Sequence, residues 1–511
     1  MALLSSISGL ATLPILGGLL CLYFVVNRLI VFVKLRKFGG PRWTGITHWP
    51  HSKQILGNNV HEWYAEVNEK YGPIARIAPG ILMTSSPEVW THVNKHPGYK
   101  RTDWFYHAAR VEHRRDNVFT QTDNAKHDKR RKQMAPGYSG RENLDLEPAI
   151  DARVAELLAL IRQNHLSTPS HIVPMDLAKK IQYLTLDVIS GVGLGKTFGM
   201  LRHDADVDAY IASNDQGLTA ANVALALGGS WLAQAPVVGR LIAPSPADGT
   251  GFGKMMAACF RAVDARAEGE TEKRSDMLAS FIRHGLSGDE LRSEALEQII
   301  AGSDTTAAAM RGALLAIMTN ARVYTKLRRE IDEAVRDGLA PGQGEGLVSL
   351  EQTRKMPYLQ AVIREALRVR PPVVCPFPRD VPAGGDTITV GGESVFVPEG
   401  ACIAYSANAM HRSEETYGED AKAFRPERWF EEDEEKLAVM KSVNDMVFGY
   451  GRFVCLGKPV AQLEMAKTIF EQLLRNFELA LIDPARPWKA HNVMGLFVIS
   501  DMWVQVMERT A

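Results

Sequence analysis

One cysteine lies in a sequence context that can support reactivity. Cys455 is preceded by two closely spaced glycines in Phe-Gly-Tyr-Gly-Arg-Phe-Val-Cys-Leu-Gly, residues 448–457. Pro459 and an apolar helical pattern that reaches Leu473 follow, so the cysteine is expected at the N-terminus of a helix. The helix dipole and free N–H groups there lower the pKa of a thiol and stabilise the thiolate.

Three interpretations of Cys455 remain at this point. A thiolate held in such a loop is either a nucleophile or an axial ligand of haem iron. The nucleophile needs a neighbouring base, and residues 448–457 contain no histidine. The third interpretation is a small buried side chain that only packs. The loop alone does not decide between the ligand and the packing residue.

An acid and two arginines form a second set of candidate residues. Glu365 and Arg368 are three positions apart, so they share one face of a helix and can form an ion pair. Arg428 lies in Phe-Arg-Pro-Glu-Arg-Trp, residues 424–429, ahead of the cysteine loop. Because exposed pairs contribute little, the spacing alone does not separate a surface contact from a buried network.

A third motif, Ala-Gly-Ser-Asp-Thr-Thr at residues 301–306, interrupts a long predicted helix. Gly302 costs about 1 kcal/mol relative to alanine in a helix, and a ligand close to the helix wall would explain it. Asp304 and Thr305 form an acid–alcohol pair of the kind that relays protons.

The elements that must position these residues are mainly helical. The helix around residues 301–306 is expected to begin at Ser287, with Glu290 as capping-box partner, and to run to about Asn320. Residues 191–197 look like a phosphate loop but lack its first glycine, so they are interpreted as a glycine-rich helix end. The short β-like segments are Ile74–Ile77, Thr387–Val390 and Ser394–Val397.

The N-terminus predicts a membrane anchor, residues 1–38, with a helix over about 10–33. Leu10–Val26 carries no charged side chain, and Leu29–Val33 extends it after Arg28. A helix over 10–33 spans about 36 Å, enough for a hydrocarbon core of roughly 30 Å. The basic residues from Lys34 to Arg42 then place the body, residues 39–511, on the cytoplasmic side of a single-pass protein.

Composition excludes several classes of protein. Lys+Arg and Asp+Glu both number 59, and this balance argues against a nucleic-acid binder. Five cysteines among 511 residues rule out a disulfide scaffold. The four cysteines other than Cys455 are expected only to pack.

Taken together and in this order, the motifs resemble the cytochrome P450 superfamily of haem-thiolate monooxygenases. The resemblance covers nearly the whole chain after the anchor. It implies a single, mainly α-helical haem domain with small β-sheets. It also implies that haem b is the cofactor, with Cys455 as its axial thiolate ligand and Phe448 shielding the sulfur from the same loop as Gly451.

The resemblance implies roles for the other motifs as well. Glu365 and Arg368 are expected to pair with Arg428 in a structural network behind the haem. Thr305 is expected to hydrogen-bond dioxygen, and Asp304 to help bring in protons. The rest of the oxygen groove is Ala301 and Gly302, and the expected partners of the haem propionates are His127, Arg131 and Arg379.

Two further expectations concern the haem edge and the substrate. The family's loop usually has arginine two places before the cysteine, but here Phe453 stands there and Arg452 comes one place earlier. Either Arg452 still reaches a propionate or that contact is lost. Apolar residues at the family's substrate-facing positions predict an apolar small molecule, and these are Val373, Val374, Phe377 and Leu496.

The expected activity is insertion of one oxygen atom from O₂ into that molecule. Electrons would come from NADPH through a separate reductase, with a b-type cytochrome as a further partner, at the endoplasmic reticulum membrane. The loop and Arg428 motifs resemble fungal secondary-metabolism members, whose substrates include terpenoids, polyketides and alkaloids. The alternatives are an O₂-independent isomerase or dehydratase, and a non-enzymatic haem sensor; the presence of Asp304 and Thr305 argues against both.

Overall fold

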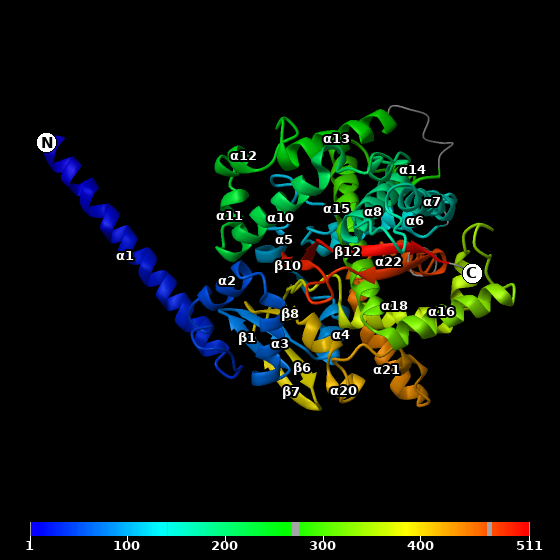
Figure 1. Ribbon diagram of the computed structural model, residues 1–511. Coiled ribbons are helices and arrows are strands. Elements are labelled where there is room, and N and C mark those ends of the chain that lie inside the picture. Colours follow the sequence, from blue (N-terminus) through cyan, green and yellow to red (C-terminus); the bar gives the residue numbers. More distant parts are fainter. Residues whose placement is uncertain (1, 141, 268–274, 468–472, 510–511) are drawn as a thin grey trace.

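A computed structural model describes all residues except 1, 141, 268–274, 468–472 and 510–511 (Figure 1). Its body is mainly helical with small sheets, as the sequence predicted, and α1 (Ala2–Lys34) projects away from it. The principal helices beside those named below are α3 (Val60–Tyr71), α6 (Asn124–Tyr138), α7 (Leu146–Asn164), α13 (Gly251–Ala267), α16 (Ala321–Arg336) and α21 (Glu434–Asp445).

The long helix α15 (Gly288–Met318) runs through the middle of the body (Figure 1). Ser287 is its N-cap as predicted, but no side-chain cap bond forms, so the expected capping box with Glu290 is wrong. Glu290 instead pairs with Arg130 at 2.7 Å. The Glu290 carboxylate therefore forms an ion pair with a residue of α6 and does not cap α15.

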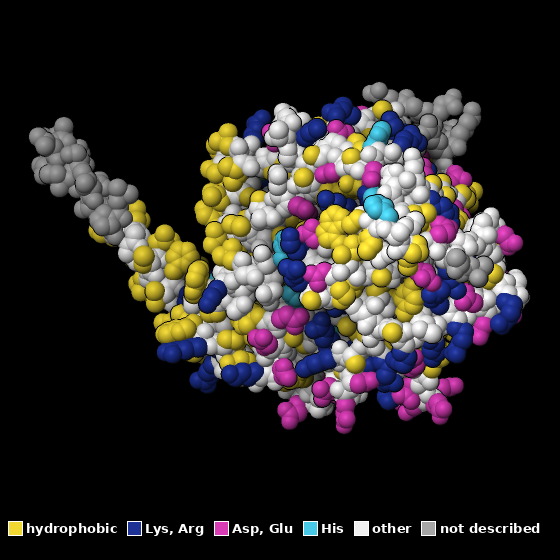
Figure 2. Space-filling view, in the orientation of Figure 1, with side chains coloured by type: hydrophobic (Ala, Val, Ile, Leu, Met, Phe, Trp, Pro, Cys, Tyr) yellow, Lys and Arg dark blue, Asp and Glu magenta, His cyan; other side chains and the backbone are white. Residues whose placement is uncertain are grey.

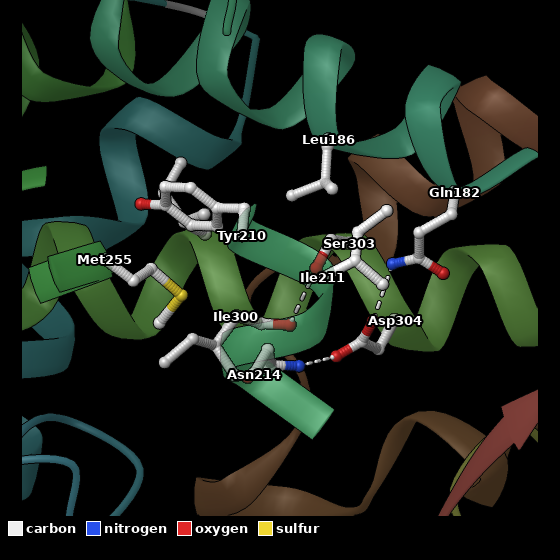
Figure 3. A pocket seen from close by; sticks show the side chains of 10 residues that line it. Gln182, Leu186, Tyr210, Ile211, Asn214, Met255, Ile300, Ser303 and Asp304 are labelled. Carbon is white, nitrogen blue, oxygen red and sulfur yellow. Dashed lines mark hydrogen bonds between the residues drawn. The ribbon is translucent and has the colours of Figure 1, made fainter. Parts of the chain in front are cut away.

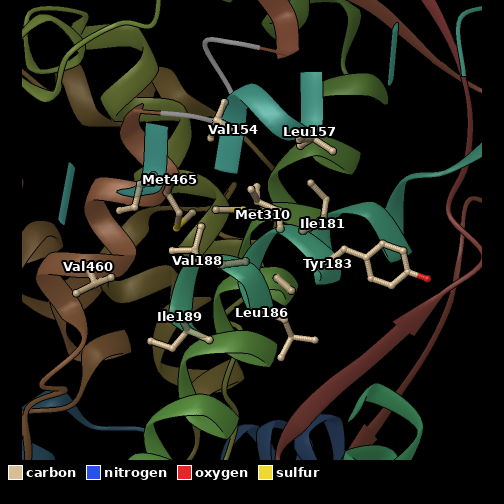
Figure 4. Packing of buried hydrophobic residues seen from close by; sticks show 14 of the residues in the cluster. Val154, Leu157, Ile181, Tyr183, Leu186, Val188, Ile189, Met310, Val460 and Met465 are labelled. Atoms are coloured by element: carbon tan, nitrogen blue, oxygen red, sulfur yellow. The ribbon is translucent and has the colours of Figure 1, made fainter. Parts of the chain in front are cut away.

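Helix α8 (Leu177–Leu194) packs against α15 and forms much of the main core (Figure 4). A Cβ at Gly302 would lie 2.6 Å from the side chain of Ile189, so the glycine lets the two helices approach closely. This gives Gly302 a packing reason that the sequence did not show. Gly195 caps α8 with φ of +69°, which confirms that residues 191–197 are a helix end.

The largest sheet has the order β1-β2-β8-β5-β3. Its strands are β1 (Ile74–Ala78), β2 (Ile81–Thr84), β8 (Cys402–Tyr405), β5 (Arg379–Asp380) and β3 (Lys100–Arg101). The register of β3 and β5 places Arg101 opposite Arg379, although the two residues are far apart in the sequence. The sheet thereby brings two arginines together at its edge.

Three smaller sheets complete the described strands. They are β6 (Asp386–Val390) with β7 (Glu393–Val397), β10 (Lys489–Val493) with β11 (Leu496–Ser500), and β4 (Met175–Asp176) with β12 (Trp503–Glu508) and β9 (Phe477–Leu481). The predicted strands Ile74–Ile77, Thr387–Val390 and Ser394–Val397 agree with β1, β6 and β7 to within one residue.

Helix α1 is long and apolar enough to cross a membrane. The segment Ile15–Lys34 has a mean hydropathy of 2.1 and none of it is buried against the body. Hydrophobic side chains also gather on the body over α11 (Ser230–Ala233) and α12 (Val238–Ile242), on the side from which α1 projects (Figure 2). Trp231 and Leu241 in this patch are 72% and 81% exposed.

Candidate active site

The cysteine loop has a backbone that only glycine permits at two positions. Gly449 and Gly451 have φ of +79° and +61°, in the left-handed region. A Cβ on Gly451 would also lie 2.8 Å from the carbonyl oxygen of Asn94 in α4 (Pro87–Lys95). The amide of Cys455 donates to the carbonyl of Phe448 at 2.7 Å, which closes the loop just before α22 (Lys458–Glu464).

The pKa of the Cys455 thiol is raised, whereas the sequence predicted that it would be lowered. Burial raises its pKa, whereas the backbone N–H groups of Gly457 and Lys458 and the charge of Arg131 act in the opposite direction. The expected net lowering of the pKa is therefore wrong, because burial outweighs the helix end. A directly bound cation such as haem iron would supply the missing stabilisation, since a coordinated thiol is deprotonated. No hydrogen bond from a histidine reaches this thiol among the described residues.

Cys455 has an accessible surface although burial dominates its pKa. Both hold if the residue faces a space inside the protein rather than the outer surface. Ala301 is likewise exposed, although it lies midway along the central helix α15. Two of the predicted cofactor-facing residues, Cys455 and Ala301, thus both keep accessible surface.

Arg101 and Arg379 are buried next to the cysteine loop. Their guanidinium groups lie 4.6 and 4.2 Å from the centre of the Phe453 ring. Arg101 donates to the carbonyl of Val118 at 2.6 Å, and Arg379 to the hydroxyl of Tyr106 at 2.6 Å. Neither has a carboxylate partner within the described chain, and the Nε atom of each is buried without a hydrogen bond.

Such a pair of buried charges requires an anion. The pKa of Arg101 is lowered to about 10, chiefly by burial and in part by the charges of Arg379 and Arg131. The two propionates of a haem are carboxylates of suitable charge, and the adjacent Cys455 offers the axial sulfur. The donor set therefore fits a haem.

The remaining predicted haem-edge residues lie around the same loop. His127 is buried, its Nδ1 is 3.0 Å from Asp128 Oδ1, and burial lowers its pKa to about 4. Arg131 donates to the carbonyl of Val454 at 2.6 Å. Arg452 forms an ion pair with Asp128, with its Nε 3.2 Å from Asp128 Oδ2, so Asp128 holds the arginine that precedes Phe453.

Glu365 lies at the centre of a fully buried network. Arg368 from the same helix, α18 (Pro357–Val369), reaches it at 2.7 Å, and Arg428 reaches it at 2.9 Å. Trp429 Nε1 donates to its second oxygen at 3.0 Å. Arg368 also donates to the carbonyls of His411 and Ala423, each at 2.9 Å. The network joins α18 to the segment that leads into the cysteine loop.

Asp304 and Thr305 point in different directions. The carboxylate of Asp304 accepts hydrogen bonds from Gln182 at 2.6 Å and from Asn214 on α10 (Tyr210–Ala226), as Figure 3 shows. The hydroxyl of Thr305 donates to the carbonyl of Ala301 at 2.9 Å. In this conformation the acid ties α8, α10 and α15 together rather than contacting its neighbour.

A cavity of about 10 Å³ lies beside Asp304. Gln182, Asn214 and Ser303 supply polar groups to its wall, and Asn214 Oδ1 is buried without a partner. This volume is about that of one water molecule, and a polar wall is where such a water is stable. Burial raises the pKa of Asp304, whereas the hydrogen bonds from Gln182 and Asn214 act in the opposite direction.

Three of the four predicted substrate-facing residues make contacts between distant segments, whereas Val374 is 1% exposed and packs in the neighbouring core. Val373 forms an isolated bridge with Leu496. The ring of Phe377 lies 6.3 Å from those of both Phe105 and Phe119. Segments far apart in the sequence thus form one apolar wall.

Comparison with known proteins agrees with this site. Residues 39–501 match the cytochrome P450 family model. The chain is 37% identical to cytochrome P450 monooxygenase ABA1 of Pyricularia oryzae, over 97% of both chains. It is 35% identical to aba1 of Botryotinia fuckeliana, over 87% of this chain and 86% of the relative, and 31% identical to abl1 of Leptosphaeria maculans, over 91% and 82%.

The fold and the site are therefore those of a haem-thiolate enzyme. The chain belongs to the cytochrome P450 family and is a monooxygenase of the type found in fungal secondary metabolism.

Sequence reasoning missed Arg101, Gln182 and Asn214. Arg101 stands in no motif, and its pairing with Arg379 depends on a sheet contact between residues 278 positions apart. Gln182 and Asn214 carry no local motif. A buried cluster of unmatched charge becomes visible only in three dimensions.

Proposed function

We propose that this protein is a membrane-anchored monooxygenase that oxidises an apolar small molecule, with a terpenoid, polyketide or alkaloid scaffold. Residues 1–38 form the anchor and 39–511 the catalytic domain. The observation that carries the proposal is the placement of Cys455 beside Arg101 and Arg379, two buried cations that lack carboxylate partners. This arrangement suits a haem, whose propionates would supply the carboxylates that neither arginine finds in the part of the chain that the structure describes.

Each part of the site has a task in this mechanism. Cys455 would hold the haem iron as thiolate, and Arg101 and Arg379, with Arg131 and His127, would hold the propionates. Bound there, the haem supplies O₂ activation, which the electron-donating thiolate favours by promoting O–O cleavage. Phe453 packs under the two arginines and keeps water from their charges.

Proton supply falls to α15. The Thr305 hydroxyl exchanges its bond to the Ala301 carbonyl for one to dioxygen, and thereby holds a proton at its Oγ1. Asp304 would return a proton to this hydroxyl after its carboxylate leaves Gln182 and Asn214 and takes a proton from water. Apolar residues around Phe377 orient the substrate and exclude water.

Membrane attachment and electron supply complete the proposal. Helix α1 and the apolar patch over α11 and α12 support membrane anchoring. We place the anchor in the endoplasmic reticulum membrane, and the basic residues from Lys34 to Arg42 favour the cytoplasmic side for the catalytic domain. Electrons come from NADPH through a separate reductase, and a b-type cytochrome is a second donor. Lys126, Lys129 and Lys132 on α6, on the Cys455 side, offer basic residues for docking.

Turnover assays test the activity. Product formation from an apolar substrate should require NADPH, a reductase and O₂ together. Turnover without O₂ would instead indicate the isomerase or dehydratase, and haem binding with no turnover of any substrate would indicate a sensor.

A further inference from the structure

Glu297 is an acid on α15 that the fold leaves largely unmatched. One carboxylate oxygen accepts a hydrogen bond from Asn117 Nδ2 at 2.9 Å. No ion pair reaches this side chain within the described residues, and its surface is only partly covered. Burial raises its pKa to about 7, and the charge of Glu294 adds to this effect, whereas Arg101 acts weakly against it.

The helix period places Glu297 on the face that carries the groove residues. Glu297, Ala301 and Thr305 are spaced by four, and each keeps accessible surface, whereas Gln298, Ile299 and Ser303 between them are buried. With a rise of 1.5 Å per residue, Glu297 lies about 6 Å from Ala301 and about 12 Å from Thr305 along the axis. Glu297 therefore lies on the same face of α15 as Ala301 and Thr305, two helical turns before Thr305.

Glu294, one turn earlier on the same helix, provides a comparison, because the protein itself satisfies its carboxylate. It is completely buried, and its two oxygens accept from Arg130 at 2.6 Å and from the amide of Val118 at 3.0 Å. Both of its oxygens are used by the protein. Glu297 has only the single amide donor, so its second oxygen is available to a ligand.

Two charged side chains, Glu294 and Arg101, act on Glu297, and apolar side chains pack nearby. The segment that carries Asn117 also contributes partly buried hydrophobic residues to the two adjoining cores, namely Ala108, Ala109, Val111, Val118 and Phe119. In ligand pockets of this kind, one or a few polar groups fix the orientation of an apolar ligand. A charged oxygen without a donor in such a place is costly unless the ligand provides the donor.

We propose that Glu297 determines specificity by accepting a hydrogen bond from a donor group of the substrate, a hydroxyl or an ammonium, at the end remote from the oxidised carbon. The inference rests on the proposed function, because it requires the substrate to lie along α15. It narrows the substrate from an apolar molecule to one that carries a donor about 12 Å from the site of attack.

Three imidazoles test this proposal on the full-length haem protein. Each carries an alkyl chain of about eight carbons, long enough to approach Glu297 from the iron, and ends in an ammonium, a hydroxyl or a methyl group. Binding is followed by the shift of the Soret band that accompanies nitrogen ligation. Glu297→Gln and Glu297→Ala are compared with Glu290→Gln, which removes an exposed acid from the same helix.

The Glu297 variants should weaken the ammonium or the hydroxyl probe at least tenfold and leave the methyl probe within twofold. Loss confined to the ammonium probe identifies a cationic donor, and loss confined to the hydroxyl probe a neutral one. Equal changes for all three probes, or none, would overturn the role of Glu297 while leaving the proposed function intact. Absence of any Soret shift in the wild type would overturn the proposed function itself, and this inference with it.

Discussion

Arg101 and Arg379 face each other across paired strands β3 and β5, and both guanidinium groups lie within 5 Å of the Phe453 ring. The loop position where the family usually has arginine thus holds an aromatic ring. Two arginines from a sheet surround this ring instead. Under the proposed function, Arg101 would add positive charge at the haem edge that the loop lacks at Phe453.

Replacing Arg101 should therefore weaken haem retention. Arg101→Ala removes one charged hydrogen-bond donor, a loss of roughly 1.5–3 kcal/mol, so haem should dissociate at least about tenfold faster. Haem transfer to an acceptor protein measures this rate. Lys100→Ala, which removes the adjacent exposed cation, should leave it unchanged; equal acceleration in both variants would contradict the assignment.

The Glu365 network should dominate stability on that side of the molecule. Arg368→Ala leaves a buried carboxylate with fewer partners and should cost about 3–5 kcal/mol. The exposed pair Lys355–Glu351 provides the comparison, because Lys355→Ala should cost less than about 0.5 kcal/mol. Urea unfolding of the haem-loaded proteins measures both, and similar costs would show that the network is not structural.

Thr305 should control how reducing electrons are used. Thr305→Ala should keep haem but release a larger share of consumed NADPH as hydrogen peroxide, because proton delivery to dioxygen is impaired. Thr305→Ser retains the hydroxyl and should restore coupling to near the wild-type level. If Thr305→Ser uncouples as strongly as Thr305→Ala, the hydroxyl is not the functional group.

The buried acids of α15 should make stability depend on pH. The pKa of Glu297 rises from its ordinary value of 4.5 to about 7 in the folded protein. Between these values the folded state binds more protons than the unfolded state, so the free energy of unfolding should fall as pH rises through this window. One pKa unit corresponds to about 1.4 kcal/mol. Thermal unfolding from pH 4.5 to 7 should show a shallower decline for Glu297→Gln; an unchanged slope would contradict the shift.

The charged groups that act on Glu297 are Glu294 on its own helix and Arg101 on β3, with Asn117 as the hydrogen-bond donor. Glu294 also titrates at about 7, again chiefly because of burial. The variant should therefore remove part of the decline rather than all of it.

The apolar patch over α11 and α12 should contact lipid. In vesicles that contain brominated lipids, Trp231→Phe should reduce the quenched fraction of tryptophan fluorescence, because Trp231 is 72% exposed within the patch. Trp503→Phe removes a tryptophan that is 42% exposed on β12, outside the patch, and should leave that fraction unchanged. An equal effect of both variants would argue against a lipid-facing patch.

Local sequence patterns predicted what short-range physics determines. The helix that carries residues 301–306 begins at Ser287, the three short strands lie where alternation predicted, and Glu365 and Arg368 pair because three positions separate them on a helix. The order of motifs was enough to reveal the family.

Long-range packing determined the features of the candidate site that the sequence did not predict. Arg101 becomes part of the haem edge only through its sheet partner, and Asp304 turns away from Thr305 because amides on two other helices bind it. The pKa of Cys455 rises because burial exceeds the effect of the helix end. None of these effects has a signature within a few residues of the side chain concerned.

The central claim is that Cys455 binds haem iron as a thiolate, and the carbon monoxide difference spectrum of the reduced protein tests it most directly. The wild type, and variants with serine at Cys21, Cys259, Cys375 or Cys402, should show the red-shifted Soret band of a thiolate ligand. Cys455→His should retain haem but give the band of an imidazole ligand. A thiolate band that survives in Cys455→His would contradict the account.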